Sequence, residues 1–256
     1  MIGCIVQARM GSVRLPNKVL MAIDQKTSVL ASVINQLKFS KKLEKILVAT
    51  TSNVEDDKIE EAVKRLGIEC FRGNEKNVLD RYYQCAKNFS ITTVVRITCD
   101  CPLIDPYILD HIVEQFFSGD YDYASNTITR TFPDGIDVEV FSLSALEKSW
   151  KNAKLPSEKE HVTSFIKNNS DLFNLKNVKN NEDLSNLRWT VDEKEDLDLV
   201  KEIFKKIPKN PILMNNILKL FSQEPDLIKI NSHIIPNEGM IKSLNEDKEF
   251  LKSQEI

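Results

Sequence analysis

The segment IGCIVQARMGSVRLPNK, residues 2–18, predicts an α/β fold that begins with a strand and an anion-binding loop. Its apolar start reads as a short buried strand, and a loop of small and basic residues follows. Arg9, Arg14 and Lys18 are the cations of this loop, and a Gly-Ser pair lies between the first two. Small residues let backbone N–H groups approach an anion closely, and guanidinium groups bind phosphate oxygens in pairs. We therefore expect a phosphate cradle, for which the alternative is a solvated basic loop.

Strands and helices alternate along the first two thirds of the chain, which is the pattern of a sheet with helical crossovers. The expected strands are residues 2–6, 45–50, 68–71 and 93–98, and the expected helices are residues 29–37, 55–66, 78–89 and 106–117. Short connections between such elements imply right-handed crossovers and parallel pairing. We expect an α/β fold with a mostly parallel central sheet and helices on both faces.

The pattern changes after residue 120. Strands are expected at residues 121–126, 136–141 and 187–191, and helices at residues 193–207 and 212–221. Ser157 and Glu160 have the spacing of a capping box that opens another helix. After the helix at 212–221 the sequence is polar and weakly patterned.

The composition indicates a globular chain of ordinary domain size in a reducing compartment. Its 256 residues include 35 basic and 38 acidic side chains, a balance that argues against binding to duplex nucleic acid. The five cysteines form no C-x-x-C pair, and their odd number argues against a disulfide framework. The sequence has no signal-peptide pattern and no apolar run of about 20 residues. We expect a cytoplasmic protein without nucleic-acid or membrane partners.

Two aspartates are expected beyond the carboxyl ends of strands, where ligands bind in open α/β sheets. Asp100 follows the strand at 93–98, and Asp192 follows the one expected at 187–191. A carboxylate opposite a phosphate loop suits Mg²⁺, which prefers one or two carboxylates together with phosphates and water. The alternatives are a turn before proline for Asp100 and a helix N-cap for Asp192. Together with the basic loop, the two aspartates predict a metal-assisted nucleotidyl transfer site.

Three other kinds of protein remain open on these residues. Asp120 and Asp122 have the D-x-D spacing of many glycosyltransferases that use sugar nucleotides. A nucleotidyltransferase that uses GTP or UTP on a sugar 1-phosphate would share the fold and the loop. A nucleotide-sensing module without catalysis would bind nucleotides without needing Asp100 or Asp192.

A series of motifs along the chain resembles the cytidylyltransferase family, which includes the acylneuraminate and 3-deoxy-manno-octulosonate cytidylyltransferases. The segment QARMGSVRLPNKVL at residues 7–20 looks like the family signature. The spore-coat polysaccharide biosynthesis branch is more similar still. The segments that match this branch are VATTSNVEDD (48–57), NVLDRYY (77–83), RITCDCPLID (96–105), FPDGIDVEVF (132–141), EHVT (160–163) and LRWTVDEKEDL (187–197).

The resemblance implies a Rossmann-like nucleotide-diphospho-sugar transferase fold, dependence on Mg²⁺ and, in many members, a homodimer. It also implies transfer of CMP from CTP to a sugar acid or related acceptor, with release of pyrophosphate, for surface polysaccharide biosynthesis. The nucleotidyltransferase domain is expected at residues 1–207, and a C-terminal helical tail at residues 208–256.

The resemblance further implies roles for single residues in the matching motifs. The expected catalytic residues, which would hold the triphosphate of CTP, are Arg9, Arg14 and Lys18. The expected Mg²⁺ ligands are Asp100 and Asp192. Nucleotide contacts are expected from Ala8, Gly11, Ser12 and Arg81. Acceptor binding is expected from the remaining motif residues, which are Asp134, Glu139, Glu160 and His161, and is open for Arg81 as well.

Two positions depart from the family pattern. Asn17 stands where the family usually has glycine, and asparagine tolerates a left-handed backbone, so we expect little effect there. Cys99 stands where glycine usually precedes the metal-binding aspartate. We expect its side chain to narrow the nucleotide site and to influence the choice of base.

Overall fold

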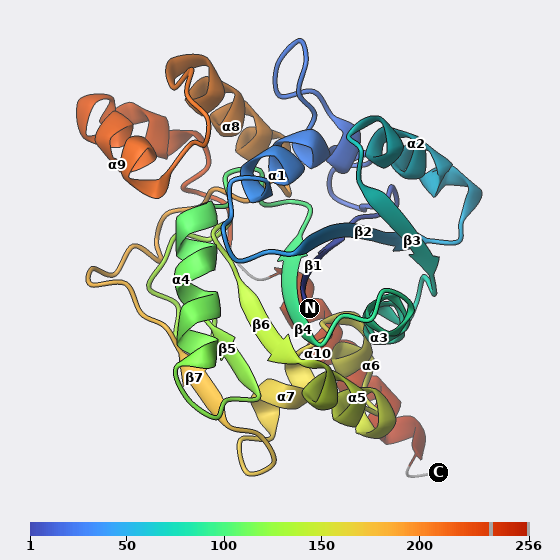
Figure 1. Cartoon of the computed structure of the whole chain (residues 1–256). Helices are drawn as coiled ribbons and strands as arrows, with labels where there is room; N and C mark the ends of the chain where they lie inside the picture. Colours follow the sequence, from blue (N-terminus) through green and yellow to red (C-terminus); the bar gives the residue numbers. More distant parts are fainter. Residues whose placement is uncertain (236–237, 255–256) are drawn as a thin grey trace.

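One sheet of seven strands runs through the part of the chain that the computed structural model describes, residues 1–235 and 238–254 (Figure 1). The strands are β1 (Ile2–Gln7), β2 (Lys45–Thr51), β3 (Glu69–Gly73), β4 (Thr93–Thr98), β5 (Tyr123–Ser125), β6 (Glu139–Ser142) and β7 (Leu175–Asn177). Their spatial order is β3-β2-β1-β4-β6-β5-β7. Strands β1 to β4 pair in parallel, whereas β6 is antiparallel to both of its neighbours. The expected α/β fold with a mostly parallel sheet is confirmed.

Helices cover both faces of the sheet (Figure 1). The helices and 3₁₀ turns are α1 (Val29–Leu37), α2 (Asp57–Arg65), α3 (Val78–Asn88), α4 (Pro106–Phe117), α5 (Leu143–Asn152), α6 (Pro156–Glu160), α7 (Ser164–Asn168), α8 (Lys194–Lys206), α9 (Met214–Gln223), α10 (Glu238–Gln254), η1 (Lys18–Leu20), η2 (Val54–Asp56) and η3 (Pro225–Ile230). Side chains alternate along β1, so Cys4 and Val6 face one apolar layer and Ile5 faces the other. The first layer includes residues of α1, α2, α4, α8 and α9, and the second includes residues of α3, α5 and α7.

The loop after β1 takes its shape from hydrogen bonds to a single backbone carbonyl. The N–H groups of Ser12 and Asn17 both donate to Met10 O, at 2.8 and 3.3 Å. The buried carboxylate of Asp56 accepts from the Met10 N–H at 2.8 Å and ties the loop to the start of α2. Asn17 has φ 61°, the left-handed conformation that asparagine tolerates. The loop ends in the short turn η1, and α1 begins only at Val29.

The prediction of a strand at residues 187–191 is wrong, because the backbone of this segment is hydrogen-bonded to two different segments of the chain. The Trp189 N–H donates to Asp134 O at 2.6 Å, and the Val191 N–H donates to Asp100 O at 2.7 Å. The segment is therefore extended without forming a continuous ladder, and its pairing with residue 134 is an isolated bridge. The bond between Val191 and Asp100 nevertheless brings the next residue, Asp192, to the end of β4.

The prediction of a capping box at Ser157 is also wrong, because the N-cap of α6 is Leu155, two residues earlier. The helix starts at Pro156, and the Glu158 carboxylate accepts from the Leu155 N–H at 2.9 Å. The Ser157 N–H instead donates to Asp247 of α10, at 2.9 Å. Helix α10 itself lies in the polar, weakly patterned part of the tail, for which the sequence predicted no helix bounds.

The segment after residue 207 is hydrogen-bonded to the rest of the described chain at several points. The Ile212 N–H donates to Gln36 Oε1 of α1 at 3.0 Å. The Asn231 side chain donates to Arg188 O at 3.0 Å. A division of the chain at residue 207 stays a prediction. Over residues 1–235 and 238–254, every helix is too short or too polar to cross a bilayer.

Candidate active site

A cavity of about 570 Å³ opens where β1 and β4 end, at the edge of the sheet at which the sequence predicted a phosphate site. The predicted residues that line it are Ala8, Arg9, Ser12, Arg14, Lys18, Arg81, Asp100, Glu160, His161 and Asp192. Gly11, Asp134 and Glu139 are not among the lining residues. The side chain of Cys99 is buried and lines the cavity.

The ammonium group of Lys18 lines the cavity and joins the two predicted carboxylates. Its Nζ donates to Asp100 Oδ2 at 3.0 Å, to Asp192 Oδ1 at 2.7 Å and to Val191 O at 2.9 Å. These bonds use all three donors of an ammonium group. Two carboxylates that lie far apart in the sequence therefore converge on one cation at this edge of the sheet.

Mutual attraction keeps this cluster charged. Burial alone would lower the pKa of Lys18, but the carboxylates of Asp100 and Asp192 raise it above its ordinary value. Burial would likewise raise the pKa of Asp100, but Lys18 and hydrogen bonds from Thr98 and Cys101 bring it down to about 2. At neutral pH the cavity thus presents an ammonium group held between carboxylates.

The donor set of this cluster fits Mg²⁺. Carboxylate oxygens are its preferred protein ligands, and Mg²⁺ commonly takes one or two carboxylates and completes its shell with phosphates and water. Asp100 and Asp192 supply such a pair. Within the described residues, no group of three or more His, Cys, Asp and Glu side chains could hold a metal ion. A magnesium ion at this pair would therefore depend on the oxygens of a substrate.

The two arginines of the loop are each paired with an acid that lies far away in the sequence. Arg14 contacts Asp192 Oδ2 at 2.9 Å and Glu193 Oε1 at 3.5 Å. Arg9 contacts Glu160 Oε1 at 3.1 Å, and both of these side chains are partly exposed. The loop cations thus face the cavity while their positions are fixed by carboxylates from α6 and from the start of α8.

Two of the backbone N–H groups predicted to contact the nucleotide already donate to backbone carbonyls. The Ala8 N–H donates to Ala49 O of β2 at 3.2 Å, and the Ser12 N–H donates to Met10 O at 2.8 Å. Both residues line the cavity. Their nucleotide contacts, and the contact predicted for Gly11, stay predictions.

Arg81 is a buried cation on the cavity wall. Its side chain is 1% exposed, Nη1 donates to Asn74 O at 3.0 Å, and Nε has no hydrogen-bond partner. Among the described residues no carboxylate forms an ion pair with it, and burial lowers the pKa of its guanidinium. Because a buried charge without a counterion is costly, this arrangement suits a site whose anion arrives with a substrate.

Glu139 acts on the cavity through Arg96, a lining residue that the sequence analysis missed. The Glu139 carboxylate pairs with Arg96 and accepts from the hydroxyl groups of Tyr123 at 2.5 Å and Thr163 at 2.6 Å. Burial would raise the pKa of Glu139, but Lys167 and Arg96 lower it below its ordinary range. A lone arginine inside the otherwise apolar strand at 93–98 was the signal that could have found Arg96.

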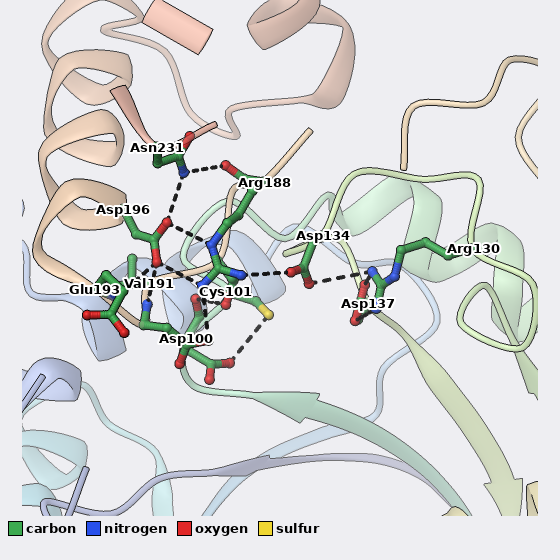
Figure 2. A network of polar contacts seen from close by, with 12 residues as sticks. Asp100, Cys101, Arg130, Asp134, Asp137, Arg188, Val191, Glu193, Asp196 and Asn231 are labelled. Carbon is green, nitrogen blue, oxygen red and sulfur yellow. Dashed lines mark hydrogen bonds and ion pairs between the residues drawn. The ribbon is translucent and has the colours of Figure 1, made fainter. Parts of the chain in front are cut away.

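Asp134 belongs to a polar network beside the cavity that is centred on Arg188 (Figure 2). Arg188 donates to both carboxylate oxygens of Asp196, each at 2.9 Å, and to Asp192 Oδ2 at 3.2 Å. Its third acid is Asp134, at 3.3 Å, and Asp134 also lies 3.5 Å from Arg130. Asp134 is thus placed to position Asp192 through Arg188. Acceptor binding by Asp134 stays a prediction.

The protonation of Asp134 should be visible in the stability of the protein. Burial and the charge of Asp137 raise the pKa of Asp134 to about 6. Between the unfolded pKa of about 4 and this value, the folded state binds more protons, so this group's contribution to stability falls as pH rises. We compare the free energy of unfolding of Asp134→Asn with that of wild type. The variant's value minus the wild-type value should be about 2 kcal/mol larger at pH 7.5 than at pH 4.5.

Urea unfolding of wild type and variant at both pH values measures this difference. The matched control is Asp171→Asn, because Asp171 is exposed. Its free energy of unfolding should differ from that of wild type by the same amount at the two pH values. An equal effect of Asp134→Asn at pH 4.5 and pH 7.5 would mean that Asp134 is ionised throughout.

The fold, together with the cations and carboxylates that converge beyond the strand ends, defines a nucleotidyltransferase. The chain belongs to the cytidylyltransferase family, whose family model matches residues 3–237. It is 33% identical over 230 residues to the spore coat polysaccharide biosynthesis protein SpsF of Bacillus subtilis, a match that covers 87% of this chain and 94% of that protein. Within the family the chain therefore falls in the spore-coat branch.

Two solved structures share this fold. A cytidylyltransferase from Leptospira borgpetersenii serovar Hardjo-bovis superposes with a TM-score of 0.86 at 35% identity, covering 93% of this chain and 99% of that one. The CMP:2-keto-3-deoxy-manno-octonic acid synthetase complexed with CTP superposes with a TM-score of 0.62 at 15% identity, covering 80% of this chain and 98% of that one. The expected nucleotide-diphospho-sugar transferase fold is confirmed.

Proposed function

We propose that the protein transfers CMP from CTP to a sugar acid or related acceptor, in a Mg²⁺-dependent reaction that releases pyrophosphate. The observation that carries this proposal is the convergence of Asp100 and Asp192 on Lys18 beside a loop with two further cations. The solved synthetase relative is described as bound to CTP, and the SpsF relative as a spore coat polysaccharide biosynthesis protein, which supports a role in making surface polysaccharide.

In this reaction an acceptor oxygen attacks the α-phosphorus of CTP, the bond to the bridging oxygen breaks, and pyrophosphate leaves with the bonding electrons. Arg9 and Arg14 bind the phosphate oxygens, and the nearby positive charge of Lys18 helps to stabilise the charge that develops on them. Asp100 and Asp192 would hold Mg²⁺, which supplies Lewis-acid neutralisation of the phosphates. Most of the rate enhancement then comes from positioning and electrostatics.

Glu160 and His161, which we propose to bind the acceptor, both line the cavity. Burial and the charge of Arg96 lower the pKa of His161, so its ring is neutral at pH 7. An acceptor that attacks through a phosphate-like oxygen needs no general base, whereas a hydroxyl group needs one. Glu160 is paired with Arg9 and His161 with Ser243, so either side chain would have to leave its partner to act as that base.

The glycosyltransferase alternative finds no support in the position of its D-x-D residues. Asp120 and Asp122 do not line the cavity. The Asp122 carboxylate accepts from the Asn174 N–H at 2.9 Å, just before β7. Its observed role is to join two strands at the far edge of the sheet. A GTP- or UTP-dependent sugar-1-phosphate nucleotidyltransferase stays open, because it would use the same loop and carboxylates.

A nucleotide panel separates these reactions. Pyrophosphate release is measured with Mg²⁺ for CTP, GTP, UTP and ATP, each against sugar acids and sugar phosphates. We expect release with CTP and one class of acceptor. Release with GTP or UTP and a sugar 1-phosphate would replace this proposal by the alternative, and consumption of a sugar nucleotide without pyrophosphate would indicate a glycosyltransferase.

Replacing Arg14 with alanine is expected to lower turnover at saturating CTP about a hundredfold, because Arg14 would stabilise charge that develops on the phosphates. Pyrophosphate release by Arg14→Ala is compared with that of Arg65→Ala. Arg65 is exposed on α2 and pairs only weakly with Glu61, so its loss should leave turnover unchanged. Unchanged turnover in Arg14→Ala would remove Arg14 from the catalytic residues.

We further propose that residues 1–207 contain the nucleotide-binding residues of a cytoplasmic enzyme and that the enzyme works as a homodimer. Light scattering after size-exclusion chromatography measures the mass directly. A mass near twice the 29.3 kDa of the chain supports the dimer, and a mass near that of one chain contradicts it.

A further inference from the structure

Helix α10 forms part of the wall of the active-site cavity, although it lies in the polar tail, far along the chain from the loop cations. It packs against α6, the helix that carries Glu160 (Figure 1). Two of its residues, Gly239 and Lys242, line the cavity together with the loop cations. The last helix of the chain therefore brings one more basic side chain to the site.

Buried polar contacts hold α10 in one register against α6. Asp247 accepts from the Ser157 N–H at 2.9 Å, and Ser243 Oγ lies 2.9 Å from His161 Nε2. Ser243 and Asp247 are both buried. Lys242 directly precedes Ser243, so the contact with His161 fixes its place at the cavity edge.

The charges at this end of the cavity do not cancel. Arg9 and Glu160 compensate each other. Arg81 is buried without a carboxylate partner among the described residues. Lys242 has an exposed, loose pair with Glu246 of its own helix, at 3.8 Å. A contact this long and this exposed contributes little, so Lys242 is free to bind a second anion.

We propose that Lys242 of α10 is a binding residue for the acceptor and contacts an anionic group of it, a carboxylate or a phosphate. The inference rests on the proposed function, since Arg14 would be occupied by the triphosphate of CTP. In this proposal the positive charges of Lys242 and Arg81 attract the acceptor, which is the second substrate. Helix α10 then completes the binding site for the acceptor.

The test uses the full-length enzyme saturated with a non-hydrolysable CTP analogue, so that the phosphate loop is filled. Inorganic phosphate and acetate are titrated separately by calorimetry into wild type, Lys242→Gln and Lys248→Gln. Lys248 is exposed on the same helix and does not line the cavity, which makes it the matched control. We expect one of the two anions to bind wild type and Lys248→Gln equally, and to bind Lys242→Gln about fivefold more weakly.

Each result has a definite meaning. Tighter binding of phosphate than of acetate identifies a phosphate group on the acceptor, and the reverse identifies a carboxylate. Equal affinity of wild type and Lys242→Gln, or no binding of either anion to the loaded wild-type enzyme, overturns the inference. Failure of the CTP analogue itself to bind overturns the proposed function, and the inference with it.

Discussion

Replacing Lys18 with methionine is expected to lower turnover about a thousandfold, because a preorganised cation near the phosphates is lost. The same change should lower the free energy of unfolding by about 3 kcal/mol, because it leaves the carboxylates of Asp100 and Asp192 close together without a counterion. Both carboxylates now lie within 3.0 Å of Lys18 Nζ. The methionine side chain is only one heavy atom shorter and is unbranched like that of lysine, so the charge is the main thing removed.

Magnesium should reverse part of this loss of stability if Asp100 and Asp192 are its ligands. A divalent cation that binds between the carboxylates stabilises the folded state by mass action. We expect Mg²⁺ to raise the melting temperature of Lys18→Met more than that of wild type. The control is Lys205→Met, which removes an exposed lysine from α8 that pairs with Glu202 at 3.5 Å. Full turnover in Lys18→Met, or no difference in its response to Mg²⁺, would contradict the assigned site.

Replacing Arg188 with methionine is expected to lower the free energy of unfolding by about 3 to 5 kcal/mol, the range for breaking a buried ion pair. Asp196 is fully buried, and both of its carboxylate oxygens accept from Arg188 (Figure 2). Asp134 would lose a partner at the same time, leaving it beside Asp137. Turnover should fall as well, because Arg188 also fixes Asp192.

Urea unfolding and pyrophosphate release test this prediction together. Arg188→Lys keeps the charge without the planar fork, so we expect it to fall between wild type and Arg188→Met in stability. Arg65→Met removes an exposed arginine and should cost less than about 0.5 kcal/mol. A stable Arg188→Met with normal turnover would show that the network of Figure 2 neither holds the fold nor positions Asp192.

The sequence predicted the parts of the site that depend on the carboxyl ends of strands. The apolar run before Arg9 and the one before Asp100 are ordinary signals of buried strands, and parallel strands end at a common edge. Asp192 was placed there for a partly wrong reason. Its segment is no strand, but a hydrogen bond between Val191 and Asp100 brings it to the same edge.

Other parts could not be predicted, because local pattern does not determine them. Helix α10 has a weak apolar periodicity, and two polar residues, Ser243 and Asp247, anchor it to a helix far away in the sequence. Strand β7 is three residues long and gives too short a pattern to detect. Asp134 and Glu139 lie in motif positions, yet they act on Arg188 and Arg96, and only the folded chain shows these partners.

The most direct test of CMP transfer is to follow the α-phosphorus of CTP. CTP labelled at the α-phosphate is incubated with the enzyme, Mg²⁺ and a panel of sugar acids and sugar phosphates, and the products are separated. The account predicts that the label appears in a CMP–acceptor conjugate while the released pyrophosphate is unlabelled. Label that stays in CTP with every acceptor, or that appears in CDP after transfer of the γ-phosphate, would contradict it.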